Sequence, residues 1–200
     1  MPRFGIEFQD HPLDLETVFE RHVGTVLDIG FGNGEAFLTA AVNSPGVDYL
    51  GVEIHEPGIG HLLLLLERAG LTNVRVIRSD VVEVLDKMLT DACLDGVNLF
   101  FPDPWPKKRH HKRRLVQPPI AREFARVIKP GGFLHVATDW EDYAEHVRDV
   151  ITATSVFRAI STEEFNADPI RLRPPTKFER RGRHLGHRVS DLVYERRDRE

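Results

Sequence analysis

The alternation of strand-like and helix-like segments constrains the fold of this chain more than any other feature. Seven short apolar segments have the composition of buried strands, and most of the segments between them suit helices. Strands that alternate with helices at this spacing predict an α/β fold with a doubly wound, mostly parallel, seven-stranded sheet. The predicted strands span residues 25–29, 48–53, 73–78, 97–101, 133–138, 155–160 and 189–195.

The sequence predicts a single domain. No linker, internal repeat or low-complexity segment interrupts residues 1–200, and this length suits one α/β domain. A short N-terminal lead, residues 1–24, precedes the first strand, and a basic loop is expected at about 163–188. Pro57 suits the start of a helix and Gly70 its end. The predicted helices span residues 15–22, 35–42, 57–69, 81–89, 114–128 and 140–152.

The composition argues against several classes of protein. Apolar residues make up 41% of the chain, which is too many for a disordered protein. The longest aliphatic run, residues 62–66, is too short to cross a bilayer, and the N-terminus lacks the apolar core of a secretory signal. Cys93 is the only cysteine, so the chain forms no internal disulfide. We therefore expect a cytoplasmic protein that does not insert into membranes.

The segment from Phe100 to Arg114 joins the fourth predicted strand to a block of positive charge. The strand runs into a proline-rich turn that holds one acid, Asp103, and one aromatic residue, Trp105. The formal charge of the chain is −4, of which residues 107–114 contribute +6, so the rest carries −10. Because ligands of α/β proteins lie at the carboxyl ends of strands, this segment predicts an acid near the ligand with a phosphate-binding patch beside it. A solvated run of charges is the alternative.

Two features of the basic segments have competing interpretations. Trp105 could stack on an unpaired RNA base, or it could pack within its own turn. The histidine pairs at 110–111 and 184–187 invite a metal-site interpretation. However, neither pair stands in a metal-site pattern and the chain has one cysteine, so we expect no metal.

A glycine-rich turn follows the first predicted strand, where residues 28–34 read Asp-Ile-Gly-Phe-Gly-Asn-Gly. This spacing differs from the Gly-x-Gly-x-x-Gly of dinucleotide-binding proteins, and Asp28 would repel a pyrophosphate. Glu53 and Asp80 end the next two strands, where acids can hold ribose hydroxyls and an adenine amine. Three acids at strand ends favour a nucleoside without phosphates, such as S-adenosylmethionine. A purely structural turn and NAD binding are the alternatives.

The C-terminal third holds a second group of candidate residues. Asp139 follows the fifth predicted strand, where it could face the ligand or cap the following helix. Residues 171–188 hold seven Lys and Arg against one acid, Glu179. Within them, residues 176–179 read Thr-Lys-Phe-Glu, which offers the groups needed to contact a base and its ribose. A solvated basic loop is the alternative.

The chain resembles the bacterial tRNA (guanine-N7)-methyltransferases over nearly its whole length. The block at 100–114 and the late Thr-Lys-Phe-Glu are specific to that family, whereas the early motifs alone indicate only an S-adenosylmethionine-dependent enzyme. The chain departs from the family in its short N-terminal lead and in a glycine-rich helix start at 56–61. The resemblance rests on residues 28–34, 51–53, 73–80, 100–114, 138–139 and 176–179.

The resemblance implies a Rossmann-like class I methyltransferase that transfers a methyl group from S-adenosylmethionine to N7 of a guanosine in the variable loop of tRNA. It implies tRNA as the partner, while the sequence indicates no obligate protein partner and leaves the oligomeric state open. Asp103 would lie at the active site. The residues implied to bind the methyl donor are Asp28, Gly30, Gly32, Gly34, Glu53, Asp80 and Asp103. Those implied to contact the substrate are Lys107, Asp139, Thr176, Lys177, Phe178 and Glu179, and those implied to contact the RNA backbone are Lys108, Arg109, Lys112, Arg113 and Arg114.

Two functions from other classes stay open. One is a methyltransferase of the same fold that acts on another RNA, a protein or a small molecule. The other is a non-catalytic RNA-binding module that retains a nucleoside pocket. If the target is guanine N7, this nitrogen has a free lone pair and no proton to lose, so transfer needs no general base. Asp103 or Asp139 would then stabilise positive charge on the purine or orient the base.

Overall fold

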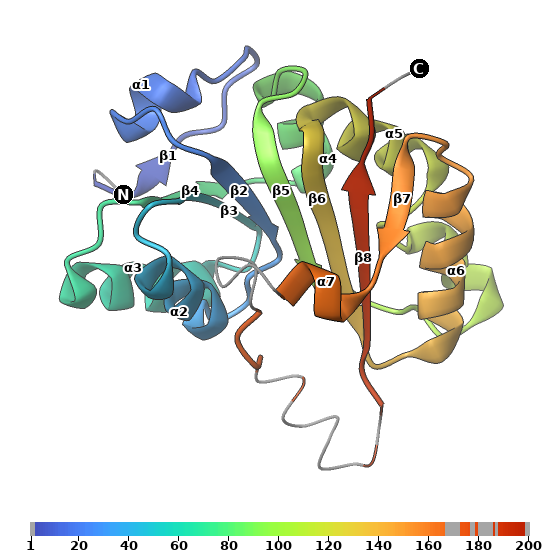
Figure 1. The fold of residues 1–200 in the computed structure, drawn as a ribbon. Helices are drawn as coiled ribbons and strands as arrows, with labels where there is room; N and C mark the ends of the chain where they lie inside the picture. Colours follow the sequence, from blue (N-terminus) through green and yellow to red (C-terminus); the bar gives the residue numbers. More distant parts are fainter. Residues whose placement is uncertain (1–2, 167–172, 177–178, 180–185, 187, 199–200) are drawn as a thin grey trace.

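The computed structural model describes residues 3–166, 173–176, 179, 186 and 188–198, so the predicted basic loop is described only in part. The described residues form one sheet with helices on both of its faces (Figure 1). None of the described helices combines the length and the apolar character that crossing a membrane would require.

The sheet confirms the predicted doubly wound α/β class. Its strand order is β1-β4-β3-β2-β5-β6-β8-β7, and β8 is antiparallel to both of its neighbours while the other pairs are parallel. The strands are β1 (Gly5–Ile6), β2 (Thr25–Ile29), β3 (Asp48–Glu53), β4 (Val74–Arg78), β5 (Leu94–Phe100), β6 (Ile128–Thr138), β7 (Phe157–Ile160) and β8 (Ser190–Arg196).

The described sheet has eight strands rather than the seven predicted, because the sequence analysis missed β1. This strand is two residues long and pairs with the edge of β4, at Gly5 with Val76 and Ile6 with Ile77. Two residues cannot show the alternation by which a strand is recognised. The seven predicted strands all form.

The strand order reverses direction between β2 and β5. From β2 the chain adds β3 and β4 on one side and then returns to place β5 on the other side, with Asp28 beside Asn98. Such a switch point leaves a crevice at the carboxyl ends of the two strands, and open α/β sheets bind their ligands there. Two of the predicted motifs, at 28–34 and 100–114, leave the sheet at this crevice.

All six predicted helices have a counterpart in the structure with shifted boundaries, and the described α7 and η2 were not predicted. The segment predicted as a helix over 114–128 begins its α-helix only at Pro118, since a residue before proline avoids helical backbone and Gln117 is extended. The described helices are α1 (Leu15–Phe19), α2 (Glu35–Asn43), α3 (Glu56–Ala69), α4 (Val81–Glu83), the π-helix η1 (Val84–Met88), the 3-10 helix η2 (Lys108–Arg113), α5 (Pro118–Val127), α6 (Glu141–Thr152) and α7 (Thr162–Asn166).

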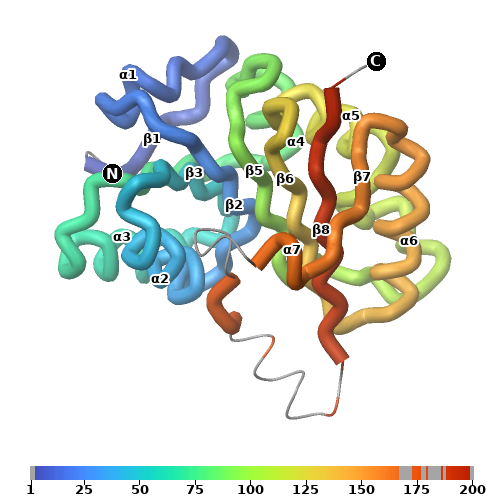
Figure 2. Tube along the Cα trace, in the orientation of Figure 1, coloured from blue at the N-terminus to red at the C-terminus, as the bar shows by residue number. Residues whose placement is uncertain are grey.

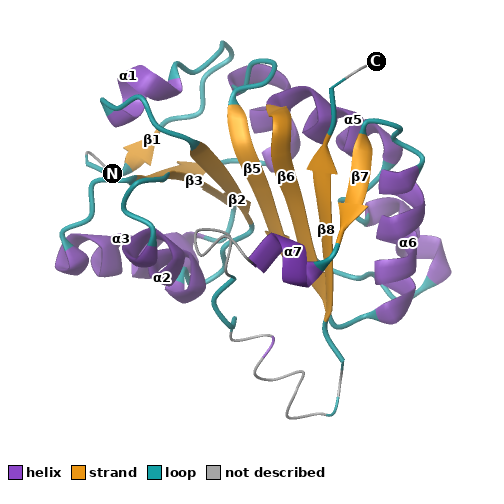
Figure 3. Ribbon diagram, in the orientation of Figure 1, coloured by secondary structure: helices purple, strands orange, loops and turns teal. Residues whose placement is uncertain are grey.

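Each face of the sheet has its own apolar core. Helices α2, α3 and α7 contribute buried residues such as Phe37, Leu62 and Phe165 to one cluster. Helices α1, α5 and α6 contribute residues such as Phe124 and Tyr143 to the other cluster, together with η1. Figure 3 shows α7 in front of the strands and α5 behind them, with α2 and α3 below β2 to β4 in this view. The face covered by α2, α3 and α7 is called the α2 face below.

Two glycines let α2 and α3 approach the turn after β2. A Cβ atom at Gly34 would lie 2.7 Å from the Cβ of Leu62 on α3, and Gly34 has a φ of +78°. A Cβ atom at Gly58 would lie 2.0 Å from the carbonyl oxygen of Gly32. The glycine-rich start of α3 therefore has a packing reason: it brings the helix against the backbone of the glycine turn.

Candidate active site at the switch point of the sheet

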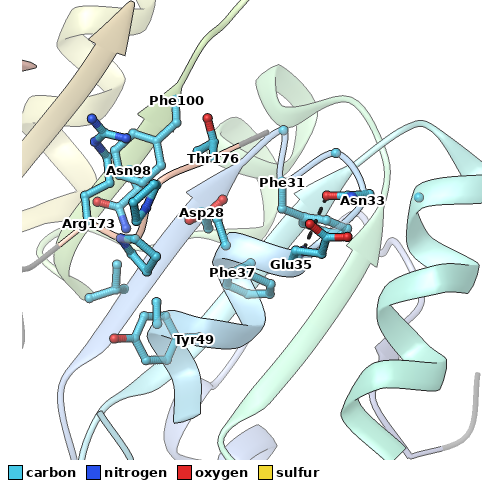
Figure 4. Close-up of a pocket in the computed structure, with 18 of the residues that line it drawn as sticks. Asp28, Phe31, Asn33, Glu35, Phe37, Tyr49, Asn98, Phe100, Arg173 and Thr176 are labelled. Atoms are coloured by element: carbon cyan, nitrogen blue, oxygen red, sulfur yellow. Dashed lines mark hydrogen bonds between the residues drawn. The ribbon is translucent and has the colours of Figure 1, made fainter. Parts of the chain in front are cut away.

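A cavity of about 360 Å³ opens beside the glycine turn on the α2 face (Figure 4). It extends from Gly30 and Gly32 inward past Asp28 to Val26 and Tyr49. Its walls come from β2, β5, α2 and the segment 173–176, and Figure 2 shows that segment beside α2 although the two are far apart in the sequence. The side chains with polar groups that line it are Asp28, Asn33, Glu35, Tyr49, His55, Asn98, Arg173 and Thr176.

Asp28 is the buried acid of this cavity. Only 6% of the residue is exposed, and burial raises the pKa of its carboxyl group to about 7. A hydrogen bond with Asn98 opposes this rise in pKa, and the nearby charge of Glu53 adds to it. No described cation pairs with the carboxylate. A positively charged ligand in the cavity would therefore stabilise the ionised form.

Two of the predicted glycines line the cavity and one does not. A Cβ atom at Gly30 or Gly32 would meet no atom within 4 Å, so the backbone of both residues faces open space. Gly34 instead packs α2 against α3, as described above. The turn thus offers bare backbone to a ligand at two positions and uses the third to hold the helices.

Glu53 and Asp80 hold backbone amides at the ends of β3 and β4. The Oε2 atom of Glu53 accepts a hydrogen bond from the Gly32 amide at 2.9 Å, and its Oε1 accepts from the amides of Ile54 and His55. Asp80 is exposed and caps α4 by accepting from the amide of Val82 at 2.9 Å.

Asp28 and Glu53 lie within the last two residues of β2 and β3, and Asp80 and Asp103 follow β4 and β5, so the four predicted donor carboxylates lie near one edge of the sheet. Asp28 lines the cavity. Glu53 lies close enough for its charge to act on Asp28, although it is not part of the lining. Asp80 and Asp103 are exposed and also lie outside the described lining of the cavity. Their contact with the donor stays a prediction.

The turn after β5 is packed around Trp105. The guanidinium of Arg113 lies 5.0 Å from the centre of its ring, and the ring of His110 meets it edge-on at 5.7 Å. Both Phe101 and Trp105 have positive φ values, 53° and 44°, which gives the loop its sharp shape. Trp105 therefore packs within its turn, and stacking on an RNA base stays a prediction.

Arg114 does not belong to the RNA-facing group, and the prediction that it contacts the RNA backbone is wrong. Its side chain is 1% exposed and lies over the ring of Tyr143 at 5.1 Å. Its Nε donates to the carbonyl oxygen of Pro104 at 2.9 Å, and its Nη2 donates to Asp142. The guanidinium therefore ties the loop to α6 from inside. The cations that stay exposed are Lys107, Lys108, Arg109, Lys112 and Arg113.

The predicted substrate residues near the C-terminus occupy different environments. Thr176 lines the cavity, and its Oγ1 accepts a hydrogen bond from the amide of Glu179 at 3.0 Å. Glu179 is 2% exposed and forms an ion pair with Arg173. Asp139 follows β6 and is half-buried, but the N-cap position of α6 belongs to Trp140. The predicted residues Lys177 and Phe178 lie outside the described part of the chain.

Three polar residues near the cavity, each at least partly buried, were not predicted. Asn98 bonds to Asp28 and is the one polar residue of the predicted strand 97–101, so its polarity was the available signal. His135 and Arg173 bind the carboxylate of Asp191, at 2.8 Å each. Arg173 stood among seven cations and carried no signal that would distinguish it from them.

The site suits a cationic nucleoside better than a metal. A buried carboxylate without a described cation, two open glycines and a largely apolar wall match a sulfonium nucleoside such as S-adenosylmethionine. Within residues 3–166 and the later described stretches, no group of three or more His, Cys, Asp or Glu side chains is arranged to hold a metal ion. His184 and His187 are not among the described residues.

Comparison with known proteins agrees with this chemistry. The profile of a family described as "Putative methyltransferase" matches residues 23–192. A tRNA (guanine-N(7)-)-methyltransferase of Nitrosococcus oceani is 50% identical over 195 residues, which cover 98% of this chain and 81% of that protein. A protein of the same name from Alkalilimnicola ehrlichii is 52% identical over 200 residues, covering 98% of this chain and 84% of its own length.

Solved structures share the fold at low sequence identity. The 16S rRNA methyltransferase KamB superposes with a TM-score of 0.60 at 16% identity, covering 92% of each chain. An rRNA methylase from Streptococcus thermophilus superposes with a TM-score of 0.58 at 13% identity, covering 88% of each chain. Both confirm the Rossmann-like methyltransferase architecture.

Proposed function

The chain belongs to the tRNA (guanine-N7)-methyltransferase family, and from this premise we propose which of its residues carry out the reaction. It is an enzyme that transfers a methyl group from S-adenosylmethionine to N7 of a guanosine in tRNA. The observation that carries our assignment of residues is the buried carboxyl group of Asp28, which has no described cation as its partner and lies beside the open glycine turn. A target in the variable loop and a cytoplasmic location are part of the proposal.

The donor-binding residues surround the crevice between β2 and β5. S-adenosylmethionine, when bound, supplies a methyl group on a positively charged sulfur. Asp28 offers the buried negative charge that a sulfonium needs, and the backbone of Gly30 and Gly32 allows close approach. We assign Glu53 and Asp80, at the ends of β3 and β4, to the ribose hydroxyls and the adenine amine. Gly34 contributes by holding α2 and α3 in place.

The chemical step requires orientation and charge stabilisation rather than proton transfer. Guanine N7 attacks with a lone pair that carries no proton, so no general base is needed. Positive charge moves from the donor to the purine, and a fixed carboxylate near that path lowers the barrier. Asp103 lies on the loop that leaves β5, next to the crevice, and Asp139 follows the neighbouring strand β6. We assign charge stabilisation to Asp103 and contact with the guanine to Asp139 and Thr176.

The exposed cations beside the crevice bind the RNA backbone. Lys107 and η2 follow the loop that carries Asp103, so the phosphates they bind lie next to the reacting base. Each neutralised phosphate adds roughly −0.7 to −0.9 to the slope of log affinity against log salt. Five exposed cations therefore predict a total slope of about −4, and tRNA binding should weaken strongly as salt rises.

One assay tests the proposal directly. The purified enzyme is incubated with S-adenosylmethionine labelled on the methyl group and with bulk tRNA that lacks the modification, and the RNA is then digested to nucleosides. Label in N7-methylguanosine is the expected result, and sequencing of the labelled tRNA locates the target loop. Label in another nucleoside or in protein would show a different substrate, and tRNA binding without transfer would show a non-catalytic module. An Asp103→Asn preparation serves as the control for contaminating activity.

A further inference from the structure

Four buried or partly buried side chains form a continuous charge network between the cavity and β8. They are His135 on β6, Asp191 on β8, and Arg173 and Glu179 near the predicted substrate segment. The side chains of His135, Arg173 and Glu179 are 3%, 8% and 3% exposed, and that of Asp191 is 27% exposed. These four residues are called the buried charge network.

Every polar position on the guanidinium of Arg173 has a partner in this network. Its Nε donates to Oδ1 of Asp191 at 2.8 Å and its Nη2 donates to Oδ2 at 3.0 Å, while its Nη1 donates to Glu179. Nε2 of His135 lies 2.8 Å from Oδ1 of Asp191, and since a carboxylate only accepts, this ring nitrogen carries the proton. Two carboxylates already neutralise the one cation, so Arg173 is not available as a receptor for an anionic ligand.

Arg173 also forms part of the cavity wall. Its guanidinium lies 5.4 Å from the centre of the Phe100 ring and 5.7 Å from that of Phe101, at the end of β5 (Figure 4). Residues 173–176 line the same cavity as Asp28. The network therefore fixes a segment that is remote in sequence against the strand that leads into the catalytic loop.

The register of the sheet extends this polar path to the donor-binding acid. Asp28 on β2 stands beside Asn98 on β5, and Asn98 stands beside His135 on β6. All three lie on the α2 face, among the apolar side chains of that core. A buried polar network whose hydrogen bonds are satisfied makes the surrounding structure more rigid.

We infer that His135 and Asp191 are positioning residues for methyl transfer: through Arg173 they hold the segment 173–176 as a wall of the donor cavity, and this wall sets the affinity for the donor. The inference rests on the proposed function, which assigns the cavity to the donor. Removal of the Asp191 charge weakens the contacts of Nε and Nη2 of Arg173, so the segment 173–176 is no longer held in one position. The backbone pairing of β8 with β6 is kept. Donor binding weakens first, and the tRNA-binding cations on η2 are unaffected.

The test compares donor affinity across three variants by calorimetric titration with S-adenosylhomocysteine, which needs no tRNA. Asp191→Asn keeps the shape of the side chain and should raise the dissociation constant about 10-fold or more. Arg173→Lys keeps the charge but loses the two-pronged contact, and should raise it by roughly 3-fold. Glu195→Gln is the matched control, because Glu195 is on the same strand as Asp191 but pairs with Arg158 away from the cavity. This variant should change the dissociation constant less than about 2-fold.

Steady-state kinetics distinguish positioning from loss of folded protein. A smaller fraction of folded enzyme lowers kcat and leaves both KM values unchanged, whereas a displaced wall raises the KM for the donor and, because Thr176 is assigned to the guanine, raises that for tRNA as well. A folded Asp191→Asn enzyme that binds S-adenosylhomocysteine like the wild type overturns the inference. If that variant does not fold, the Arg173→Lys affinity decides by the same criterion. A wild-type enzyme that binds S-adenosylhomocysteine but does not methylate tRNA refutes the proposed function. The affinities of the variants for S-adenosylhomocysteine can still be compared in that case.

Discussion

The cavity beside the glycine turn and the loop from 101 to 114 meet at the same crevice, but the first buries a charged group and the second exposes most of its charges. In the cavity a single carboxylate, Asp28, is buried without a described cation, and burial raises its pKa to about 7. In the loop five cations stand in solvent and one, Arg114, is buried with partners on every side. The loop thus keeps its many charges where water stabilises them, and buries one only to fix its own shape.

The sizes of the two proposed ligands would account for this difference. A small cationic nucleoside offers one charge, so the site gains affinity by holding a single opposite charge in a dry environment, where electrostatic interactions are strong. An RNA backbone offers many phosphates, so each contact can be weak and solvent-exposed, and the sum supplies the affinity. Single substitutions should therefore have large effects in the cavity and small effects on the loop surface, with Asp103 and Arg114 as the exceptions.

The largest effect is expected at Asp103. A large effect at this exposed residue would show that burial alone does not predict the size of a substitution's effect. Asp103 is exposed, but it is assigned to stabilise charge that develops in the transition state. Asp103→Asn should lower kcat by about 10²–10³-fold with little change in the KM for tRNA. Asp139→Asn is the matched comparison, because a residue that only contacts the base should raise the KM for tRNA instead. Single-turnover kinetics on both variants provide the measurement, and the opposite pattern would exchange the two roles.

Asp28→Asn should sharpen the comparison by separating stability from binding. The folded pKa is raised from 3.8 to about 7, so the folded state holds its proton more tightly than the unfolded state, and Asp28 lowers the free energy of unfolding as pH rises from about 4 to 7. At pH 8 the ligand-free variant should be more stable than the wild type, by up to about 4 kcal/mol, and below pH 4 the two should agree. Urea unfolding across this range measures the difference. A variant that is less stable at pH 8 would mean that the fold itself neutralises the carboxylate.

The same substitution should weaken donor binding and remove its pH dependence. A cationic ligand favours ionised Asp28, so the affinity of the wild type for S-adenosylmethionine should rise between pH 6 and 8, with proton release on binding below pH 7. The variant should bind roughly 10-fold more weakly at pH 8 and show a flat profile. Calorimetry in buffers of different ionisation enthalpy counts the protons. Equal proton release by the two proteins would assign the titration to another group.

Arg114→Met tests whether the one buried cation of the loop is structural. Its loss leaves the Pro104 carbonyl oxygen without its described donor and removes the tie to Asp142, so we expect a destabilisation of about 2–3 kcal/mol. The slope of tRNA affinity against salt should stay the same, because this side chain reaches no phosphate. Urea unfolding and filter binding at several salt concentrations give the two numbers. A flatter slope with unchanged stability would return Arg114 to the RNA-facing group.

Arg113→Gln is the counterpart on the loop surface and should have the smallest effect. Arg113 is exposed, and its described contact is the stacking on Trp105. The free energy of unfolding should fall by no more than about 0.5–1 kcal/mol. The salt slope of tRNA binding should flatten by about 0.7–0.9, with a loss of affinity of a few fold at moderate salt. An unchanged slope would mean that Arg113 serves only to pack the turn.

The sequence predicted the architecture and the edge of the sheet at which the crevice lies, because both depend on local patterns. Alternating strands and helices require a parallel sheet, and parallel strands bring their carboxyl ends to one edge, so the acids at 28, 53, 80 and 103 had to gather there. Boundaries were predicted less well where local rules compete. Residues 114–117 have helix-forming composition, but the prolines at 118 and 119 start the α-helix later.

The amino-acid sequence by itself determined the fold class, the place of the ligand crevice and the chemistry of its edge, since periodicity and strand direction are local properties that the chain carries along its length. Only the tertiary structure decided which charged side chains are buried away from water. Burial depends on neighbours that are distant in sequence: His135 meets Asp191 across 56 residues, and Arg114 meets Asp142 across 28. Identical arginines at 113 and 114 therefore face opposite environments, one in solvent over Trp105 and the other beneath the loop that it holds.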